Sequence, residues 1–430
     1  MNKFEKYSSY KDSGVEWLEE IPEHWEIDKL KNYCKAFGRI GFRGYNTSDL
    51  VNESEGAITI SPSNIFEYSM TFNKCSFLRW EKYYESPEIQ IEENDILIVK
   101  TGSTFGKIGM VKNLPEKATI NPQLLVLKDI KIEQRFFYYM MTSSVIQTQV
   151  NQQVIGSTIP TISESKILNF VSILPSKEEQ TKIASFLDEK TAQIDEVISQ
   201  KEKLIELLKE RKQIVINDAV TKGLDKDVEM TDSGVEWIGK IPKHWEVIKF
   251  KHLFYEKKKT HDISLNCGSI SFGKVVEKND EKIPASTKAS YQVLNKGEFL
   301  INPLNLNYDL KSLRIGLSDL DVVVSSGYII IKNKENIDKI YFNWLLHRYD
   351  ISFMKTLGAG VRQTLNFGDI AETLLVNPPL EEQIKIAEYI ENQTSKIDIA
   401  IELQQNYISK LKEYKASLID SVVTGKVKIS

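Results

Sequence analysis

The sequence predicts two globular blocks in a pseudo-twofold repeat, separated by two long antiparallel helices. Three observations predict this architecture. A segment of 21 residues that begins with DSGVEW at Asp12 returns at Asp232 with 13 identical positions. A second segment, PSKEEQTKIASFLDEKTAQID at Pro175, returns as PPLEEQIKIAEYIENQTSKID at Pro378. A heptad pattern of apolar residues runs through each copy of the second segment, which is typical of a coiled coil.

The repeated segments divide the 430 residues into four parts. We expect a first block at 1–174, a central helix at 175–222, a second block at 223–377 and a C-terminal helix at 378–430. A composition of 41% hydrophobic and 27% charged residues is typical of globular domains. No apolar run approaches the roughly 18 to 20 residues that cross a bilayer, and the N-terminus lacks the apolar core of an export signal. We therefore expect a cytoplasmic protein without membrane contact.

The two helices share one spacing of apolar positions. The predicted seam consists of Ile183, Leu187, Lys190, Ile194, Val197, Lys201, Leu204, Leu208, Arg211 and Val215, and then of Ile386, Ile390, Gln393, Ile397, Ala400, Gln404, Tyr407, Leu411, Tyr414 and Leu418. The polar interruptions coincide, since Lys190 and Lys201 correspond to Gln393 and Gln404. Such residues usually fix the register of a coiled coil; the alternative is a contact for a partner. Around Leu204 the apolar arc is wide enough for further helices to dock.

The order of the repeated segments predicts the direction of the helices. The first helix leads into the second DSGVEW segment, whereas the second helix ends the chain and the equivalent segment stands at the N-terminus. The repeat is therefore circular, and we expect the two termini to lie close together. The helices then run antiparallel, with one block at each end.

The distribution of charge and the spacing of cysteine and histidine limit the kinds of binding site that the chain can hold. The net charge is −4, but the acidity lies in residues 1–27 (−4) and 223–247 (−3), whereas residues 28–174 carry +1 and residues 248–377 carry +4. This distribution permits binding to DNA. The cysteines form no CxxC pair and the histidines no HxxxH pair, so we expect neither a disulfide framework nor a metal site.

The doubled DSGVEW and IPxHWE segments, the PxxEEQxKIA helix starts and the DILIVKTGSTFGKIGMV stretch at Asp95 resemble the specificity subunits of type I restriction–modification systems. The resemblance implies that each block is a target-recognition domain of mixed α/β (α+β) fold that reads one half of a bipartite double-stranded DNA target. Because the blocks have diverged, the two half-sites should differ.

The resemblance also implies the partners. The paired helices should act as a spacer and dock two modification (methyltransferase) subunits, and restriction subunits should complete the complex. The chain itself should be non-catalytic and hold no cofactor, because S-adenosylmethionine, ATP and Mg²⁺ belong to the partner subunits.

In the first block, three loops are candidates for reading DNA: Gly38–Tyr45, Thr101–Lys107 and Gly156–Thr161. Arginine reads guanine edges bidentately, whereas serine, threonine and lysine more often contact phosphates. The candidate residues are Arg39, Arg43, Thr101, Ser103, Thr104, Lys107, Ser157 and Thr158. Ordinary solvated loops are the alternative interpretation.

The second block offers three consecutive lysines, the NPLNLNYDLKSLR run from Asn302, a serine-rich turn and a GVRQT loop. Lysines suit phosphates, and asparagine and glutamine suit adenine edges. The candidate residues are Lys257, Lys258, Lys259, Asn305, Asn307, Tyr308, Lys311, Arg314, Ser326, Tyr328, Arg362 and Gln363.

Several fragments imitate catalytic motifs. Gly102–Lys107 is one residue short of a phosphate-binding loop and continues into Ile108 instead of serine or threonine. Asn377, Pro378 and Pro379 approach the NPP-aromatic motif that holds a flipped adenine, but Leu380 follows. A self-contained methyltransferase or nuclease is thus the second hypothesis, and a structural coiled-coil tether is the third.

The repeated HWE motif is interpreted as a packing anchor and not as a catalytic site at His24 and His244. Large aromatic side chains bury wide areas at such joints, and the residues expected to do so are Trp17, Trp25, Trp237 and Trp245.

Overall fold

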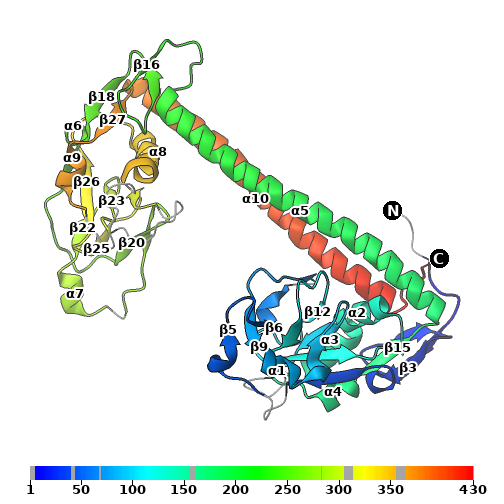
Figure 1. Cartoon of the computed structure of the whole chain (residues 1–430). Helices are drawn as coiled ribbons and strands as arrows, with labels where there is room; N and C mark the ends of the chain where they lie inside the picture. The colour runs from blue at the N-terminus through cyan, green and yellow to red at the C-terminus, as the bar shows by residue number, and fades with distance from the viewer. Residues whose placement is uncertain are drawn as a thin grey trace. The chain divides into compact units, whose positions relative to one another are not determined.

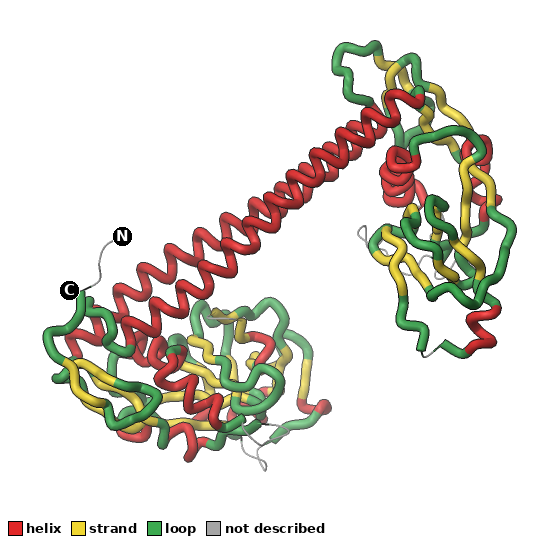
Figure 2. The backbone as a smooth tube through the Cα atoms, turned by 180° about the vertical axis from the view of Figure 1, so that it is seen from behind, coloured by secondary structure: helices red, strands yellow, loops and turns green. Residues whose placement is uncertain are grey.

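The computed structural model describes residues 5–39, 44–66, 69–154, 160–281, 283–304, 313–354 and 365–429. They form two compact units, of which the first comprises Met1–Gln200 with Asn406–Ser430 and the second comprises Lys201–Gln405. Each unit holds one mixed α/β block and part of both long helices (Figures 1 and 2).

The strands of the first unit are β1 (Tyr10–Asp12), β2 (Glu20–Pro22), β3 (Glu26–Lys29), β4 (Lys35–Gly38), β5 (Leu50–Val51), β6 (Gly56–Ile60), β7 (Ile65–Phe66), β8 (Ser69–Met70), β9 (Ser76–Arg79), β10 (Gln90–Ile91), β11 (Ile96–Val99), β12 (Ile108–Met110), β13 (Ala118–Ile120), β14 (Leu124–Lys128) and β15 (Val171–Leu174). Its helices are α1 (Trp80–Tyr84), α2 (Gln134–Thr142), α3 (Ser144–Gln152), α4 (Glu164–Leu168), the beginning of α5 (Lys177–Lys222) and the end of α10 (Leu380–Val423).

An antiparallel sheet with the order β12-β11-β14-β4 lies at the centre of the first block. All of β11 is apolar and buried, because successive side chains point to opposite faces and both faces are covered. Ile96 and Ile98 join the cluster that contains α2, α3 and the long helices. Leu97 and Val99 join the cluster beneath a second sheet, with the order β10-β13-β6-β9-β5.

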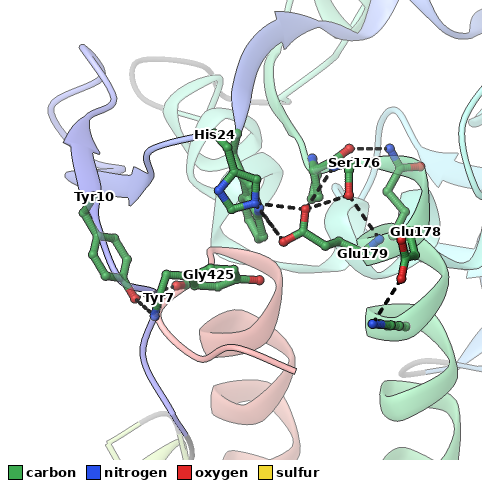
Figure 3. Close-up of polar contacts among 11 residues, drawn as sticks. Tyr7, Tyr10, His24, Ser176, Glu178, Glu179 and Gly425 are labelled. Atoms are coloured by element: carbon green, nitrogen blue, oxygen red, sulfur yellow. Dashed lines mark hydrogen bonds and ion pairs between the residues drawn. The ribbon is translucent and has the colours of Figure 1, made fainter. Parts of the chain in front are cut away.

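The HWE segment of the first block anchors α5, and Figure 3 shows its His24 beside Glu179 of that helix. Trp25 is fully buried, and its indole N–H donates to Glu179 Oε1 at 3.3 Å. His24 Nε2 lies 2.9 Å from the same oxygen. Burial alone would raise the pKa of Glu179, but hydrogen bonds from His24, Ser176 and Trp25 outweigh it and lower the pKa. The interpretation of HWE as a packing anchor is confirmed.

The glutamine that follows this glutamate connects α5 to the block. Gln180 Oε1 accepts from the backbone N–H of Glu133 at 3.0 Å, and Gln180 Nε2 donates to the carbonyl of Pro175 at 2.8 Å. Glu133 is the N-cap of α2 and accepts from Phe136 N. The EEQ motif thus fixes the first turn of α5 against the start of α2.

The strands of the second unit are β16 (Met230–Asp232), β17 (Lys240–Pro242), β18 (Glu246–Lys249), β19 (Phe254–Glu256), β20 (Gly268–Ser271), β21 (Lys274–Glu277), β22 (Gln292–Leu294), β23 (Phe299–Ile301), β24 (Ile315–Leu317), β25 (Val322–Val324), β26 (Ile329–Asn333) and β27 (Leu374–Asn377). Its helices are α6 (Phe250–Leu253), α7 (Ala285–Ala289), α8 (Lys339–Tyr349), the π-helix η6 (Asp350–Met354), α9 (Phe367–Ala371), the end of α5 and the beginning of α10.

The second block repeats the central sheet of the first. Its order, β19-β26-β23-β24, corresponds to β4-β14-β11-β12. The parallel pair of β6 and β13 corresponds to a parallel bridge between Cys267 and Val323. The outer strands are reduced to the pairs β20–β21 and β22–β25.

The second joint repeats the contacts of the first. Trp245 N–H donates to Glu382 Oε2 at 3.0 Å, and His244 Nε2 lies 2.6 Å from Glu382 Oε1. Gln383 Oε1 accepts from the N–H of Asp338, the N-cap of α8, at 2.8 Å. Trp17 and Trp237 are partly buried against the cores of their own units.

In each unit, α5 and α10 lie side by side and run antiparallel, as the repeat predicts (Figure 1). Lys415 Nζ lies 2.7 Å from Asp195 in the first unit, and Lys212 Nζ lies 2.7 Å from Asp398 in the second. These ion pairs occupy equivalent positions of the repeat. In the second unit, Lys201 Nζ donates to Gln404 Oε1 at 2.9 Å, so two equivalent positions meet.

Part of the predicted seam is wrong by one residue. Ile198 and Ile205 are buried against the neighbouring helix, whereas Val197 is 39% exposed and Leu204 is 42% exposed. In α10, Lys415 is buried and Tyr414 is 52% exposed. Arg211 and Tyr407 are exposed and give way to Lys212 and Ile408, and the predicted seam residues Lys190 and Gln393 are less buried than their neighbours Thr191 and Thr394. The prediction failed where two adjacent apolar residues fit the heptad equally well. It also failed at Lys212 and Lys415, because ion pairs with the other helix hold these lysines in the seam.

The two ends of the chain meet within the first unit. Glu5 and Lys428 form an antiparallel bridge, and the Tyr10 hydroxyl donates to the carbonyl of Gly425 at 3.1 Å (Figure 3). This contact confirms the circular repeat. In the part of the chain that the structure describes, every helix is too short or too polar to span a membrane.

Candidate nucleic-acid interface

Two of the candidate loops of the first block meet at the end of β11. Thr101 and Thr161 form an antiparallel bridge, and the Thr161 hydroxyl donates to Thr101 Oγ1 at 3.2 Å. The backbone N–H of Ile162 donates to the carbonyl of Lys100 at 3.0 Å. The fold therefore joins Thr101–Lys107 to the end of Gly156–Thr161.

The third candidate loop begins beside them. A Cβ atom built on Gly38 would lie 3.2 Å from both Lys100 Nζ and Glu164 Oε1. Burial lowers the pKa of Lys100, and the nearby Glu164 opposes this shift. The described residues of all three loops thus lie at one end of the central sheet, where β11 and β4 end and β14 begins.

Within this cluster, Ser103 is exposed, and Thr101, Thr104 and Lys107 are half-buried. Sequence reasoning missed Gln123, which is exposed in the turn between β13 and β14 and whose carbonyl accepts from Lys100 N at 2.8 Å. A Cβ atom built on Gly102 would lie 3.2 Å from Gln123 Nε2. The Asn-Pro-Gln sequence predicts a turn, but it does not show that this turn lies beside the Thr101–Lys107 loop.

The side chain of Arg39, a predicted reader of base edges, lies inside the fold. Its side chain is 4% exposed, donates to the carbonyl of Ile120 at 3.1 Å and to Thr119 Oγ1 at 2.9 Å, and lies against the ring of Tyr45. Burial lowers the pKa of the guanidinium. Arg39 therefore ties β4 to β13 in the chain without DNA, and its role as a reader of guanine stays a prediction.

In the second block, the lysine run and the serine-rich turn come together. Lys259 Nζ donates to the carbonyl of Ser326 at 2.9 Å, and Tyr328 N donates to the carbonyl of Ser325 at 3.1 Å. Lys258, Lys259 and Ser326 are exposed, and Tyr328 is half-buried. These residues form a polar cluster suited to phosphates.

Two candidate cations of this block lie inside the fold. Lys257 Nζ is 2.7 Å from Glu298 Oε2, which is itself buried, and 3.0 Å from the carbonyl of Val293. Arg314 Nε donates to Asp350 Oδ1 at 2.8 Å, with Arg314 6% exposed and Asp350 fully buried. Both charges are already paired within the block, and direct contact of Lys257 and Arg314 with DNA stays a prediction.

The remaining candidates lie outside the described residues: Arg43, Ser157, Thr158, Asn305, Asn307, Tyr308, Lys311, Arg362 and Gln363. Across the described ranges, no group of three or more His, Cys, Asp or Glu residues is arranged to hold a metal ion.

The family described as "Type I restriction modification DNA specificity domain" matches residues 23–207 and 242–406, which include both joints and most of both blocks. The chain belongs to this family. It is a type I restriction–modification specificity subunit with two copies of the domain, as the resemblance implied.

Relatives match along nearly the whole subunit. A putative type I restriction enzyme MjaX specificity subunit of Methanocaldococcus jannaschii is 24% identical over 447 residues, covering 98% of each chain. The type I restriction enzyme EcoBI specificity subunit of Escherichia coli is 22% identical over 445 residues, covering 97% of this chain and 89% of the relative.

Solved structures share the fold. A chain from work on complex assembly and conformational transition of the type I R-M system has a TM-score of 0.65 at 14% identity, covering 94% of this chain and 98% of that one. The HsdS subunit of Thermoanaerobacter tengcongensis has a TM-score of 0.51 at 15% identity, covering 95% and 98%.

Proposed function

We propose that this specificity subunit reads a bipartite, asymmetric double-stranded DNA target in the cytoplasm, with one block for each half-site. The observation that carries the proposal is that one architecture occurs twice with different loops on it. The first block presents Thr101, Ser103 and Gln123, whereas the second presents Lys258, Lys259 and Ser326. Two equivalent domains in one chain suit two half-sites, and different side chains suit different bases.

The long helices dock two modification subunits, and restriction subunits join through them. Apolar side chains outside the observed seam support this role: Val197, Leu204, Leu207, Ile399, Leu403 and Tyr407 are each at least 39% exposed. Apolar side chains at helical spacing on the outer faces of a coiled coil are suited to burial against another protein.

The subunit itself performs no methyl transfer, ATP hydrolysis or cleavage; S-adenosylmethionine, ATP and Mg²⁺ act in the partner subunits. Two local structures support this part of the proposal. The GSTFGK sequence leads from β11 into strand β12, whereas a phosphate-binding loop leads into a helix. Asn377 ends β27, and its side-chain oxygen accepts from Gln383 Nε2 at 3.2 Å, so it belongs to the entry of α10.

The test is to map methylated adenines in genomes with and without this gene. The proposal expects one bipartite motif to disappear without the gene. A second strain, in which residues 28–174 are exchanged for the block of another family member, should change one half of the motif and keep the gap.

Three outcomes would contradict the proposal. Methyl transfer by the purified chain alone would favour an enzyme, binding without any sequence preference would favour a structural tether, and a change in both halves after the exchange would exclude independent reading by the two blocks.

A further inference from the structure

Each block carries one strongly exposed phenylalanine on a β-hairpin. Phe66 is 62% exposed at the end of β7 in the hairpin β7–β8, and Phe272 is 72% exposed in the turn of the hairpin β20–β21. Every other phenylalanine in the described ranges is buried or half-buried. A phenylalanine in this position gives up most of the free energy that burial would supply.

The two hairpins occupy equivalent places. A Cβ atom built on Gly109 of β12 would lie 3.1 Å from Met70 Cγ and 3.2 Å from Ile65 Cγ1, so β7–β8 packs directly on that glycine. A Cβ atom built on Gly316, in the equivalent strand β24, would lie 2.5 Å from the carbonyl oxygen of Gly273. Both blocks therefore use a glycine in the same strand to bring a hairpin close to the sheet.

The turn of the second hairpin is strained at its aromatic residue. Ser271 pairs with Lys274, so Phe272 and Gly273 are the two turn residues, with φ values of +47° and +76°. A turn with two positive φ values strongly favours Asn-Gly, and a bulky side chain is rare at its first position. Strain together with exposure at one residue indicates a role in binding.

Both hairpins lie beside a candidate reading segment. β12, on which β7–β8 packs, continues directly from the Thr101–Lys107 loop. In the second block, Gly273 N donates to the carbonyl of Leu313 at 3.2 Å, at the end of the NPLNLNYDLKSLR run, and the neighbouring Lys274 is exposed. The strands on which the two hairpins pack, β12 and β24, thus each follow a segment that holds candidate DNA-contact residues.

We propose that Phe66 and Phe272 enter a groove of the DNA and make apolar contacts with bases, each in the half-site that its own block reads. This inference rests on the proposed function. Phenylalanine contacts bases by partial insertion at a base step or by packing on a thymine methyl group. Both contacts depend on the base sequence and so add specificity that phosphate contacts do not supply.

The decisive variant is Phe272→Asn, which places the favoured Asn-Gly pair in the turn. The full chain is assembled with its modification subunits, and binding is measured on a duplex with the mapped target and on duplexes with either half-site scrambled. We expect about tenfold weaker binding to the target, from the loss of one base contact. Unfolding should occur at a temperature about 2 °C higher, because the turn strain is removed.

The control is Ile263→Asn, because Ile263 is 65% exposed in the same block but lies outside the hairpin. Its affinity for the target should change less than about twofold, as is usual for an exposed position without a contact. Phe66→Asn should weaken binding to the target, and scrambling the half-site of the first block should remove the difference from the unaltered chain.

Opposite results would overturn the inference. The inference fails if Phe272→Asn leaves the affinity for the target unchanged. It also fails if the variant loses as much affinity for scrambled DNA as for the target, or if it no longer assembles with the modification subunits while its affinity for DNA is unchanged. If the unaltered complex already lacks a sequence preference, the proposed function fails; if it has one that both variants keep, only this inference fails.

Discussion

In the first unit, Glu179 receives hydrogen bonds from His24 and Trp25, and in the second unit Glu382 receives them from His244 and Trp245. The joints are the same, whereas the exposed loops of the two blocks differ. The first block exposes Ser103 and Gln123, and the second exposes Lys258, Lys259 and Ser326. Residues that hold a block to the helices are repeated, and residues that present a surface have diverged.

The largest expected effect tests whether the joints are equally important. Replacing Trp25 by alanine should destabilise the chain by about 3–5 kcal/mol, because a large, fully buried side chain leaves a cavity. Trp245→Ala should cost a similar amount, since Trp245 is 5% exposed and makes the same contact. Urea unfolding followed by circular dichroism measures both. A loss below 1 kcal/mol in one variant alone would show that the joints are not equivalent.

A second pair of variants separates the hairpins. Gly316→Ala should cost about 2–3 kcal/mol, because the added methyl group meets the backbone oxygen of Gly273 at 2.5 Å. Gly109→Ala should cost about half as much, because it meets the flexible side chains of Met70 and Ile65. Thermal unfolding of the two variants gives the comparison, and equal losses would contradict the packing described for the two hairpins.

The equivalent ion pairs of the coiled coil should differ in strength. Asp195→Ala leaves Lys415, whose side chain is 8% exposed, without this carboxylate, so we expect a loss of about 1–2 kcal/mol. Asp398→Ala should cost less than about 1 kcal/mol, because Lys212 is 23% exposed and can be hydrated. Urea unfolding of both variants checks this order, and the reverse order would show that burial of the lysine does not control the energy.

The smallest expected effect is a pH dependence of the first joint. The pKa of Glu179 is lowered in the folded chain, so its contribution is complete above the unfolded value of about 4.3 and is lost as the pH falls through the folded value. Glu179→Gln should therefore lose less stability than the unaltered chain between pH 5 and pH 3, by under about 1 kcal/mol for a partly exposed group. Parallel urea titrations test this, and identical slopes would exclude a role for its charge.

The repeated segments predicted the arrangement of the helices correctly, whereas the heptad spacing predicted part of the seam incorrectly. The repeated anchors predicted antiparallel helices and termini that meet, and the Tyr10–Gly425 contact confirms the second point. The heptad spacing did not separate Val197 from Ile198 or Leu204 from Ile205, since each pair is apolar on both sides of the stripe. The fold resolves the ambiguity through partners on the other helix.

In the candidate interface, too, the sequence determined some features and the tertiary structure determined others. The sequence alone determined that the chain is a circular repeat of a block and a helix, because repeated segments and their order need no knowledge of contacts. Only the tertiary structure decided that Arg39 and Arg314 lie inside the fold, that Gln123 lies beside Gly102, and that Phe66 and Phe272 occupy equivalent hairpins. Burial of a charge depends on groups far along the chain, as with Asp350, which lies 36 residues from Arg314.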